Sequence, residues 1–136
     1  KRQQAGQKLV EEFKAKTGNP DIYYYNADFT DLQQIKTLAE SVKRDFSRLD
    51  VLLNNAGVFM NEKVMLPNGF EMTQVVNHLA VFALTLQLLD LVKQSSSGRI
   101  IVTSSMAHSA SIDFGNLNGE KHWDSYNAYA VSKLEN

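Results

Sequence analysis

The stretch Leu49-Asp50-Val51-Leu52-Leu53-Asn54-Asn55-Ala56-Gly57 decides how this sequence folds. Its first half is short and apolar, as expected for a strand that lies inside a parallel sheet, and its last four residues are polar or small. In a sheet of parallel strands, ligands bind beyond the carboxyl ends of the strands. The segment Asn54–Gly57 therefore predicts one edge of a ligand-binding cleft.

Helical and strand patterns alternate on both sides of this stretch. Segments with apolar residues at helical spacing are expected to form helices at 2–17, 30–47, 70–93 and from 126 onward. Short segments rich in aliphatic or aromatic residues are expected to form strands at 22–25, 49–53 and 99–103. Strands that alternate with helices pair in parallel through right-handed crossovers, so the sequence predicts an α/β fold with a doubly wound, Rossmann-type parallel sheet.

The two ends of the chain predict that this sheet is incomplete. The sequence begins at Lys1 inside one helical pattern and stops at Asn136 inside another, and neither end carries a capping signal. We therefore expect residues 1–136 to be the central part of a single domain whose first and last strands are missing.

Composition and charge argue against several classes of partner for this segment. The net charge is −1 and the basic residues are scattered, which argues against nucleic acid and anionic lipid. No stretch approaches the roughly 20 uninterrupted apolar residues of a membrane span, so no membrane contact is expected within it. The location of the parent protein, cytoplasmic or membrane-associated, stays open. Cysteine is absent and the three histidines lack metal-ligand spacing, so no metal is expected.

Polar residues follow each predicted strand and continue into the last helix. Asp28 follows the first strand, and Ser104 and Ser105 follow the third. Tyr129 and Lys133 are four residues apart, a spacing that places both side chains on one face of a helix. A tyrosine and a lysine at this spacing are expected by chance in about one sequence of three with this composition. The pair therefore counts only together with the motifs at the strand ends.

Together these motifs resemble the short-chain dehydrogenase/reductase pattern. The pattern has Asn-Asn-Ala-Gly after one strand, here 54–57, a serine pair after the next, here 104–105, and then Tyr-x-x-x-Lys, here 129–133. Other stretches are similar to the retinol dehydrogenase-like branch, namely 67–71, 76–79, 104–108 and 129–134. The resemblance implies an NAD(P)-dependent oxidoreductase that transfers a hydride between a nicotinamide cofactor and a lipophilic alcohol or carbonyl compound, retinoid-like or steroid-like.

Four catalytic roles are implied by the resemblance. Tyr129 is expected to be the general acid/base for the substrate oxygen, and Ser105 is expected to hydrogen-bond that oxygen. Because a phenol in water has a pKa of about 10, a nearby cation must favour its anion, and Lys133 supplies that charge. Asn77 matches the helix asparagine whose backbone carbonyl holds a water in the proton relay to the lysine.

The resemblance also implies which residues bind the cofactor. Asn54, Ala56 and Gly57 are expected to line the cofactor cleft, because small residues permit close approach of the backbone. Tyr129 and Lys133 complete it, since the family uses this lysine to bind the ribose hydroxyls.

Two positions bear on adenine binding and on the choice of coenzyme. Asp28 matches the acidic residue that holds the adenine ring, although an aspartate just before a helix is often only an N-cap. Lys1 or Arg2 falls near the position where this branch often places a basic side chain, which would pair with a 2′-phosphate. The expected cofactor is therefore NADP, with NAD as the alternative.

The sequence departs from the family pattern in one important respect. None of its seven glycines forms the glycine-rich turn that presents backbone N–H groups to the pyrophosphate. The isolated chain is therefore expected to bind cofactor weakly and not to turn over.

Several readings stay open. The helix at 70–93 is apolar on more than one face, which fits a homodimer interface or simple burial. Residues 112–123 either fold over the cleft, with Phe114, Leu117 and Trp123 as an apolar substrate wall, or form an ordinary packed loop. The competing functions are a protochlorophyllide reductase-like enzyme and a non-catalytic scaffold of the same fold that binds proteins.

Overall fold

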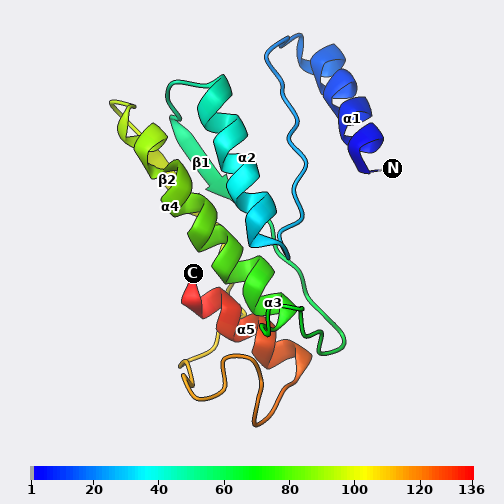
Figure 1. Cartoon of the computed structure of the whole chain (residues 1–136), viewed down its shortest axis with the longest axis vertical. Helices are drawn as coiled ribbons and strands as arrows, with labels where there is room; N and C mark the ends of the chain where they lie inside the picture. The colour runs from blue at the N-terminus through cyan, green and yellow to red at the C-terminus, as the bar shows by residue number, and fades with distance from the viewer. Residues whose placement is uncertain (1) are drawn as a thin grey trace.

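The computed structural model describes residues 2–136, apart from the side chain of Arg2, and a small parallel sheet lies at its centre (Figure 1). β1 (Val51–Asn54) pairs in parallel with β2 (Arg99–Val102), in the register that places Val51 opposite Arg99. The chain between the two strands forms a long helix, as the crossover between parallel strands requires. The strands predicted at 49–53 and 99–103 are confirmed to within two residues at each end.

Two helices pack together and bury part of this sheet. α2 (Leu32–Asp45) and α4 (Ala80–Lys93) lie against each other (Figure 1). Asp31 caps α2, because its carboxylate accepts the backbone N–H groups of Gln33 and Gln34. The buried apolar side chains of these elements form the core: Ile35, Ala39, Leu52, Ala80, Leu84, Leu88, Leu91 and Val92. The burial of this apolar surface is the main force that holds the helices to the sheet.

The strands are expected to lie buried inside a parallel sheet, but β1 is buried on one face only and β2 is largely exposed. Side chains alternate along a strand, so Leu52 and Asn54 of β1 face the helices and are buried. Val51 and Leu53 point the other way and are 50% and 59% exposed. No helix among the described residues covers that face of the sheet, and the apolar pattern of the strands alone does not reveal which face a helix covers.

The strand predicted at 22–25 does not join the sheet. The segment is extended but has no hydrogen-bonded neighbour strand within residues 2–136, and together with α1 (Arg2–Thr17) it stands apart from β1 (Figure 1). A strand needs a partner for its backbone groups, so a strand-like sequence without one remains extended chain. The Tyr24 ring lies against Gly6 of α1, which has no room for a Cβ atom.

The helix predicted at 70–93 is one helical segment whose hydrogen-bonding pattern changes near its start. α3 (Met72–Gln74) and η1 (Val75–Leu79) precede α4, and η1 is a π-helical turn. The N–H of Ala80 donates to the carbonyl of Val75, five residues earlier, across this turn. Glu71 caps the start of α3 by accepting the N–H of Gln74. π turns inside helices occur often at functional sites.

The apolar character of this long helix is only partly explained by burial. Six residues of α4 are buried, but Phe82 and Leu86 are 56% and 54% exposed, so simple burial, one of the two explanations that the sequence leaves open, does not account for the whole apolar surface of the helix. Phe82 and Leu86 are four residues apart and share one face, and a homodimer through this helix stays a prediction. By length and composition, Met72–Lys93 is also the one helix of the described chain that could cross a membrane. Half of its apolar stretch is buried, as in the core helix of a globular protein.

α5 (Ser125–Glu135) follows a long loop after β2 and lies against α3 and η1 (Figure 1). Asp124 caps it by accepting the N–H of Asn127, and the helix begins at Ser125, one residue before the predicted start. α5 packs on the π turn, and its Tyr129 contacts Phe59 in the segment that follows β1.

Candidate active site

Tyr129 and Lys133 lie one turn apart on α5, and their side chains turn to the same side of the helix. The ammonium nitrogen of Lys133 is 5.6 Å from the centre of the Tyr129 ring. It donates a 2.9 Å hydrogen bond to the carbonyl oxygen of Thr103, directly after β2, and Lys133 is only 4% exposed. A buried ammonium is costly unless it is hydrogen-bonded, and the Thr103 carbonyl offsets part of that cost. The predicted juxtaposition of this tyrosine and lysine is therefore present.

Asn77, in the π turn η1, is fully buried and joins two parts of the site. Its side-chain oxygen accepts the N–H of Val58 at 2.7 Å, and its amide nitrogen donates to the Val58 carbonyl at 3.0 Å and to the Ser132 hydroxyl at 2.9 Å. The side chain of Asn77 thus holds the segment after β1 against α5. The backbone carbonyl of Asn77 accepts a 2.8 Å hydrogen bond from the amide of Asn136, so it has a protein partner in this structure.

The backbone at Gly57 passes close to both Asn77 and Lys133. A Cβ atom at position 57 would lie 3.3 Å from the side-chain oxygen of Asn77 and 3.4 Å from the Lys133 ammonium. Ala56 and Gly57 are themselves exposed at the carboxyl end of β1. An exposed edge of small residues lets a ligand approach the backbone closely, so binding of the cofactor at Ala56 and Gly57 stays a prediction.

The side chain of Asn54 points to the face of the sheet that α4 covers, away from the exposed residues Ala56 and Gly57. It is 6% exposed, and its amide donates a 3.0 Å hydrogen bond to the hydroxyl of Thr85 on α4. Its neighbour Asn55 instead accepts a 3.0 Å hydrogen bond from the Thr103 hydroxyl, on the exposed side. The structure therefore does not bring the Asn54 side chain to the predicted cleft. The alternation of side chains along β1 is the signal that separates the two asparagines.

The loop after β2 is fastened to α5 by its serines. The Ser104 hydroxyl donates to the carbonyl of Lys133 at 2.7 Å, and the N–H of Ser109 donates to the carbonyl of Ala130 at 3.0 Å. Ser105 lies between these two attachments, half-buried, and its hydroxyl oxygen accepts the N–H of Ala107 at 3.0 Å. Ser105 is thus held next to the helix that carries Tyr129, whereas its contact with a substrate oxygen stays a prediction.

Asp28 lies in an open hollow beyond the extended segment. Its carboxylate accepts hydrogen bonds from the N–H and the hydroxyl of Thr30, at 3.0 and 2.7 Å. The alternative reading, that Asp28 is only an N-cap, is wrong because Asp31 caps α2. The hollow has a volume of about 410 Å³ and is lined by Ala27, Asp28, Phe29, Thr30, Val58, Met72 and Val76. Ligand clefts typically measure about 300–1,000 Å³, so it has room for a ring system such as adenine.

Phe59 is a candidate site residue that the sequence patterns did not single out. Its ring centre lies 5.5 Å from that of Tyr129, at an interplanar angle of 55°, and the residue is 51% exposed. The only signal in the sequence is its place two residues after Gly57. Its exposed ring beside the phenol offers an apolar surface to a ligand.

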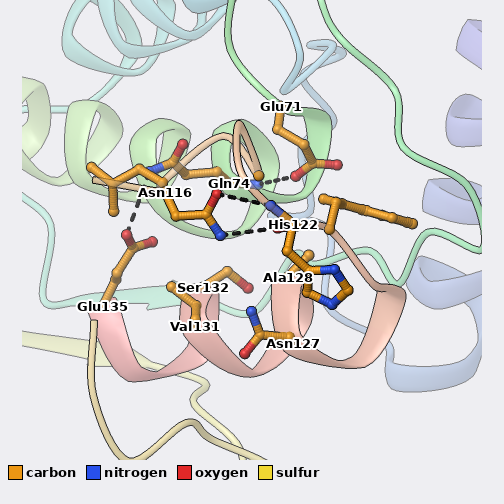
Figure 2. Close-up of a pocket in the computed structure, with 12 residues that line it drawn as sticks. Glu71, Gln74, Asn116, His122, Asn127, Ala128, Val131, Ser132 and Glu135 are labelled. Atoms are coloured by element: carbon orange, nitrogen blue, oxygen red, sulfur yellow. Dashed lines mark hydrogen bonds between the residues drawn. The ribbon is translucent and has the colours of Figure 1, made fainter. Parts of the chain in front are cut away.

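The aromatic and aliphatic residues of the 112–123 loop lie elsewhere. Leu117 and Trp123 line a small cavity together with Asn127, Val131 and Glu135 of α5 (Figure 2). On a helix these positions are on the side away from Tyr129 and Lys133. Phe114 is 81% exposed. Leu117 and Trp123 are therefore part of a packed loop and do not form a wall beside Tyr129.

Glu135, two residues after Lys133, has a perturbed acidity. Burial raises the pKa of its carboxyl group above the ordinary value of 4.5, while His78 and the hydrogen bond from Gln74 act in the opposite direction. The hydrogen bond from the Gln74 amide to Glu135 measures 3.4 Å.

The prediction on coenzyme choice rests on Lys1 or Arg2. Lys1 and the side chain of Arg2 lie outside the part of the chain that the structure describes.

Comparisons with known proteins extend over almost the whole chain. A family model described as short chain dehydrogenase matches residues 1–134. Retinol dehydrogenase 11 of Homo sapiens is 39% identical over 132 residues, which cover 96% of this chain and 42% of that protein. The chain thus spans less than half the length of this relative.

Solved structures match equally broadly. An uncharacterised protein from Mycobacterium paratuberculosis is 32% identical, with a TM-score of 0.72 over 91% of this chain and 44% of that one. RhlG of Pseudomonas aeruginosa, in its active-site complex with NADP, is 26% identical, with a TM-score of 0.67 over 93% of this chain and 48% of that one. These matches confirm the predicted α/β, Rossmann-type fold.

Proposed function

Because the chain belongs to the short-chain dehydrogenase family, we propose that the protein containing it is an NAD(P)-dependent oxidoreductase acting on lipophilic alcohols or carbonyl compounds. One observation carries the proposal. The buried Lys133 ammonium lies beside the Tyr129 ring, close to the backbone of Gly57 at the open end of β1. A protein-binding scaffold has no physical need for a buried cation at this place, which supports an enzyme.

Tyr129 is the proposed proton carrier of the reaction. In carbonyl reduction its phenol donates a proton to the substrate oxygen, and in alcohol oxidation the phenol oxygen accepts that proton. The Lys133 ammonium stabilises the negative charge that the phenol carries after donating, because opposite charges attract strongly in a site with little water. The Thr103 carbonyl fixes the ammonium in this position. The transferred hydride is the chemistry that a bound nicotinamide dinucleotide supplies.

Asn77 and Ser105 are proposed to support this proton transfer in different ways. Asn77 is a positioning residue, because its side chain ties Val58 to Ser132 and so sets the distance between the edge of β1 and α5. Ser105 is proposed to hydrogen-bond the substrate oxygen, since the loop that carries it is attached to α5 on both sides.

The same edge of the sheet is proposed to hold NADP or NAD. Ala56 and Gly57 would lie along the dinucleotide, Lys133 would reach its ribose, and Asp28 would face its adenine from the 410 Å³ hollow. Asn54 would support this edge from behind through Thr85 rather than touch the cofactor. The solved complex of RhlG with NADP supports the phosphorylated form of the coenzyme.

The proposed substrate is a lipophilic alcohol or its carbonyl form, retinoid-like or steroid-like. The match to retinol dehydrogenase 11 supports this class. The exposed ring of Phe59 beside Tyr129 supports it independently, because an apolar surface at the reacting end favours an apolar substrate.

The test is carbonyl reduction by the complete protein, with retinal and a short aliphatic aldehyde as substrates. We expect Tyr129→Phe to lower the rate by about 10²–10⁴-fold while dinucleotide affinity is kept. Tyr126→Phe is the matched control, since Tyr126 lies on the same helix, is 61% exposed and is expected to leave the rate unchanged. If Tyr129→Phe retained the reduction rate, the proton-transfer role would be wrong. A wild-type protein that binds dinucleotide but turns over neither substrate would favour a scaffold.

A further inference from the structure

The hydroxyl group of Ser132 connects the side chain of Asn77 to the backbone of Tyr129. It accepts a 2.9 Å hydrogen bond from the Asn77 amide and donates a 2.7 Å hydrogen bond to the carbonyl oxygen of Tyr129, three residues earlier on α5. Ser132 is only 1% exposed, so it has almost no surface to offer to a ligand. Ser132 is therefore joined to two candidate site residues without being placed to touch a substrate or cofactor.

The direction of these hydrogen bonds follows from the groups at their start. The N–H of Val58 can only donate, so it holds the side-chain oxygen of Asn77 and turns the amide nitrogen toward the Val58 carbonyl and Ser132. Because that nitrogen can only donate, Ser132 accepts from it, and its single hydroxyl proton goes to the Tyr129 carbonyl. A continuous chain of hydrogen bonds thus runs from the segment after β1 to the backbone of Tyr129.

A serine inside a helix often donates to a carbonyl of its own helix, and such a bond alone does not indicate a function. Ser41 of α2 has this ordinary arrangement, since its hydroxyl donates to the carbonyl of Thr37 at 3.0 Å on the exposed surface. Ser132 differs because its oxygen also accepts a hydrogen bond from another element, the π turn η1. That second bond limits the rotation of α5 about its own axis relative to η1.

The rotation of α5 decides where Tyr129 and Lys133 point. Ser132 directly precedes Lys133 and follows Tyr129 by three residues, so all three turn together with the helix. The Lys133 ammonium and the side-chain oxygen of Asn77 both approach Gly57, at 3.4 and 3.3 Å from a Cβ atom placed there. A rotation that separates Ser132 from Asn77 would therefore move the ammonium relative to this edge of the sheet.

We propose that Ser132 is a positioning residue whose hydroxyl fixes α5 so that Tyr129 and Lys133 face the edge of the sheet at Gly57. This proposal rests on the proposed function, because it assigns Ser132 to the reaction in which Tyr129 carries the proton. Reacting groups need close alignment, and a misplacement of about 1 Å can lower a rate by about 10²-fold. Loss of the hydroxyl should lower kcat but leave the KM for the carbonyl substrate nearly unchanged.

The test compares Ser132→Thr with Ser132→Val in the complete protein, with retinal as substrate. Threonine and valine both branch at Cβ and are close in size, but only threonine has a hydroxyl that can bond a carbonyl three or four residues earlier in a helix. We expect kcat, normalised to the folded fraction, to be about tenfold higher in the threonine variant. Equal kcat values would overturn the proposal, because a role in packing alone does not need the hydroxyl.

Ser132→Ala keeps the experiment decisive where the larger side chains disturb folding. It removes the hydroxyl without adding volume, and we expect its kcat to fall by about tenfold. Ser41→Ala is the matched control, because it removes a hydroxyl that bonds within a helix outside the candidate site, and its kcat should equal that of the wild type. The same kcat in Ser132→Ala and Ser41→Ala would overturn the proposal.

Crystal structures of the complete protein separate this proposal from the proposed function. A wild-type protein that turns over no carbonyl compound would contradict the proposed function, whatever Ser132 does. The positioning of the pair is then decided by the Lys133 ammonium, which lies 5.6 Å from the centre of the Tyr129 ring. A shift of either group relative to Gly57 in Ser132→Ala would support the proposal, and unchanged positions would overturn it.

Discussion

The ammonium nitrogen of Lys133 lies 5.6 Å from the centre of the Tyr129 ring and is tied to the carbonyl of Thr103. Tyr129 is the proposed proton carrier, and Lys133 holds its ammonium group almost out of contact with bulk water. The hydrogen bond to Thr103 links this pair on α5 to the end of β2, so the charge is positioned by the sheet as well as by the helix.

Lys133→Met keeps a long unbranched side chain, one atom shorter than lysine, but removes its charge. We expect the rate of carbonyl reduction to fall by about 10²-fold or more, because the phenolate of Tyr129 loses its counter-charge. Steady-state kinetics and dinucleotide titration of the complete protein measure the two expected effects, a lower kcat and weaker cofactor binding. Lys121→Met is the matched control, since Lys121 pairs with Asp113 on the exposed surface and should affect neither quantity. Equal effects of the two variants would argue against the role of Lys133.

Gly57→Ala tests the close approach at the end of β1. The new methyl group would lie 3.3 Å from the oxygen of Asn77 and 3.4 Å from the nitrogen of Lys133, on the edge proposed to hold the dinucleotide. We expect dinucleotide affinity to drop by about tenfold, which corresponds to about 1.4 kcal/mol. Calorimetric titration measures it. In Gly115→Ala, the nearest atom to the added methyl is the flexible end of Lys121, so unchanged affinity is expected there.

Asn77→Leu removes three hydrogen bonds in one substitution, two to Val58 and one to Ser132. The N–H and carbonyl of Val58 would be left without their partner, so we expect the free energy of unfolding to fall by about 2–4 kcal/mol. Urea denaturation followed by circular dichroism measures this change. Asn19→Ala, which removes one exposed hydrogen bond to the N–H of Asp21, should change stability by less than about 0.5 kcal/mol. A loss of that small size in Asn77→Leu would contradict the positioning role.

Glu135→Gln tests the carboxyl group whose pKa burial raises. A raised pKa in the folded state favours the protonated form, so the stability from Glu135 is present below its ordinary pKa of 4.5 and is lost as the pH rises through the raised pKa. Because the glutamine does not titrate, the variant should gain stability relative to the parent as the pH rises above 4.5. Urea unfolding at a series of pH values measures the difference.

A second variant, at His78, tests whether the pH dependence comes from Glu135, because His78 acts on the pKa of Glu135. His78 on η1 lowers its pKa, and Glu71 and His122 line the same cavity. In a His78→Gln background the pKa of Glu135 should rise further, so the gain of the Glu135→Gln variant at neutral pH should be larger. A gain that is independent of pH in both backgrounds would show that Glu135 does not titrate in this range.

Local patterns were sufficient to predict most elements and the central pair of the site. Three of the four predicted helices and two of the three predicted strands lie within about two residues of their observed ends, and the long fourth helix contains an unforeseen π turn. The spacing of Tyr129 and Lys133 was enough to place them on one side of a helix. Side-chain directions repeat every 3.6 residues along a helix and every 2 residues along a strand, so residues close in the sequence are enough to predict them.

Other features depended on which distant segments meet. Alternation along β1 predicts that Asn54 and Asn55 point to opposite faces of the sheet, but only the packing of α4 shows that Asn54 is the one that turns to Thr85. The strand-like segment 22–25 and the exposed face of β1 likewise reflect which neighbours are present.

The alternation of strands and helices, the family and the candidate pair of Tyr129 and Lys133 follow from the residues alone. The packing of the elements places Phe59 beside Tyr129, and it places Gln74, Trp123 and Glu135 around one cavity on the side of α5 away from Tyr129. The physical reason is that side-chain direction along one element follows from covalent geometry, whereas contacts between elements follow from how their surfaces pack and which buried polar groups find partners.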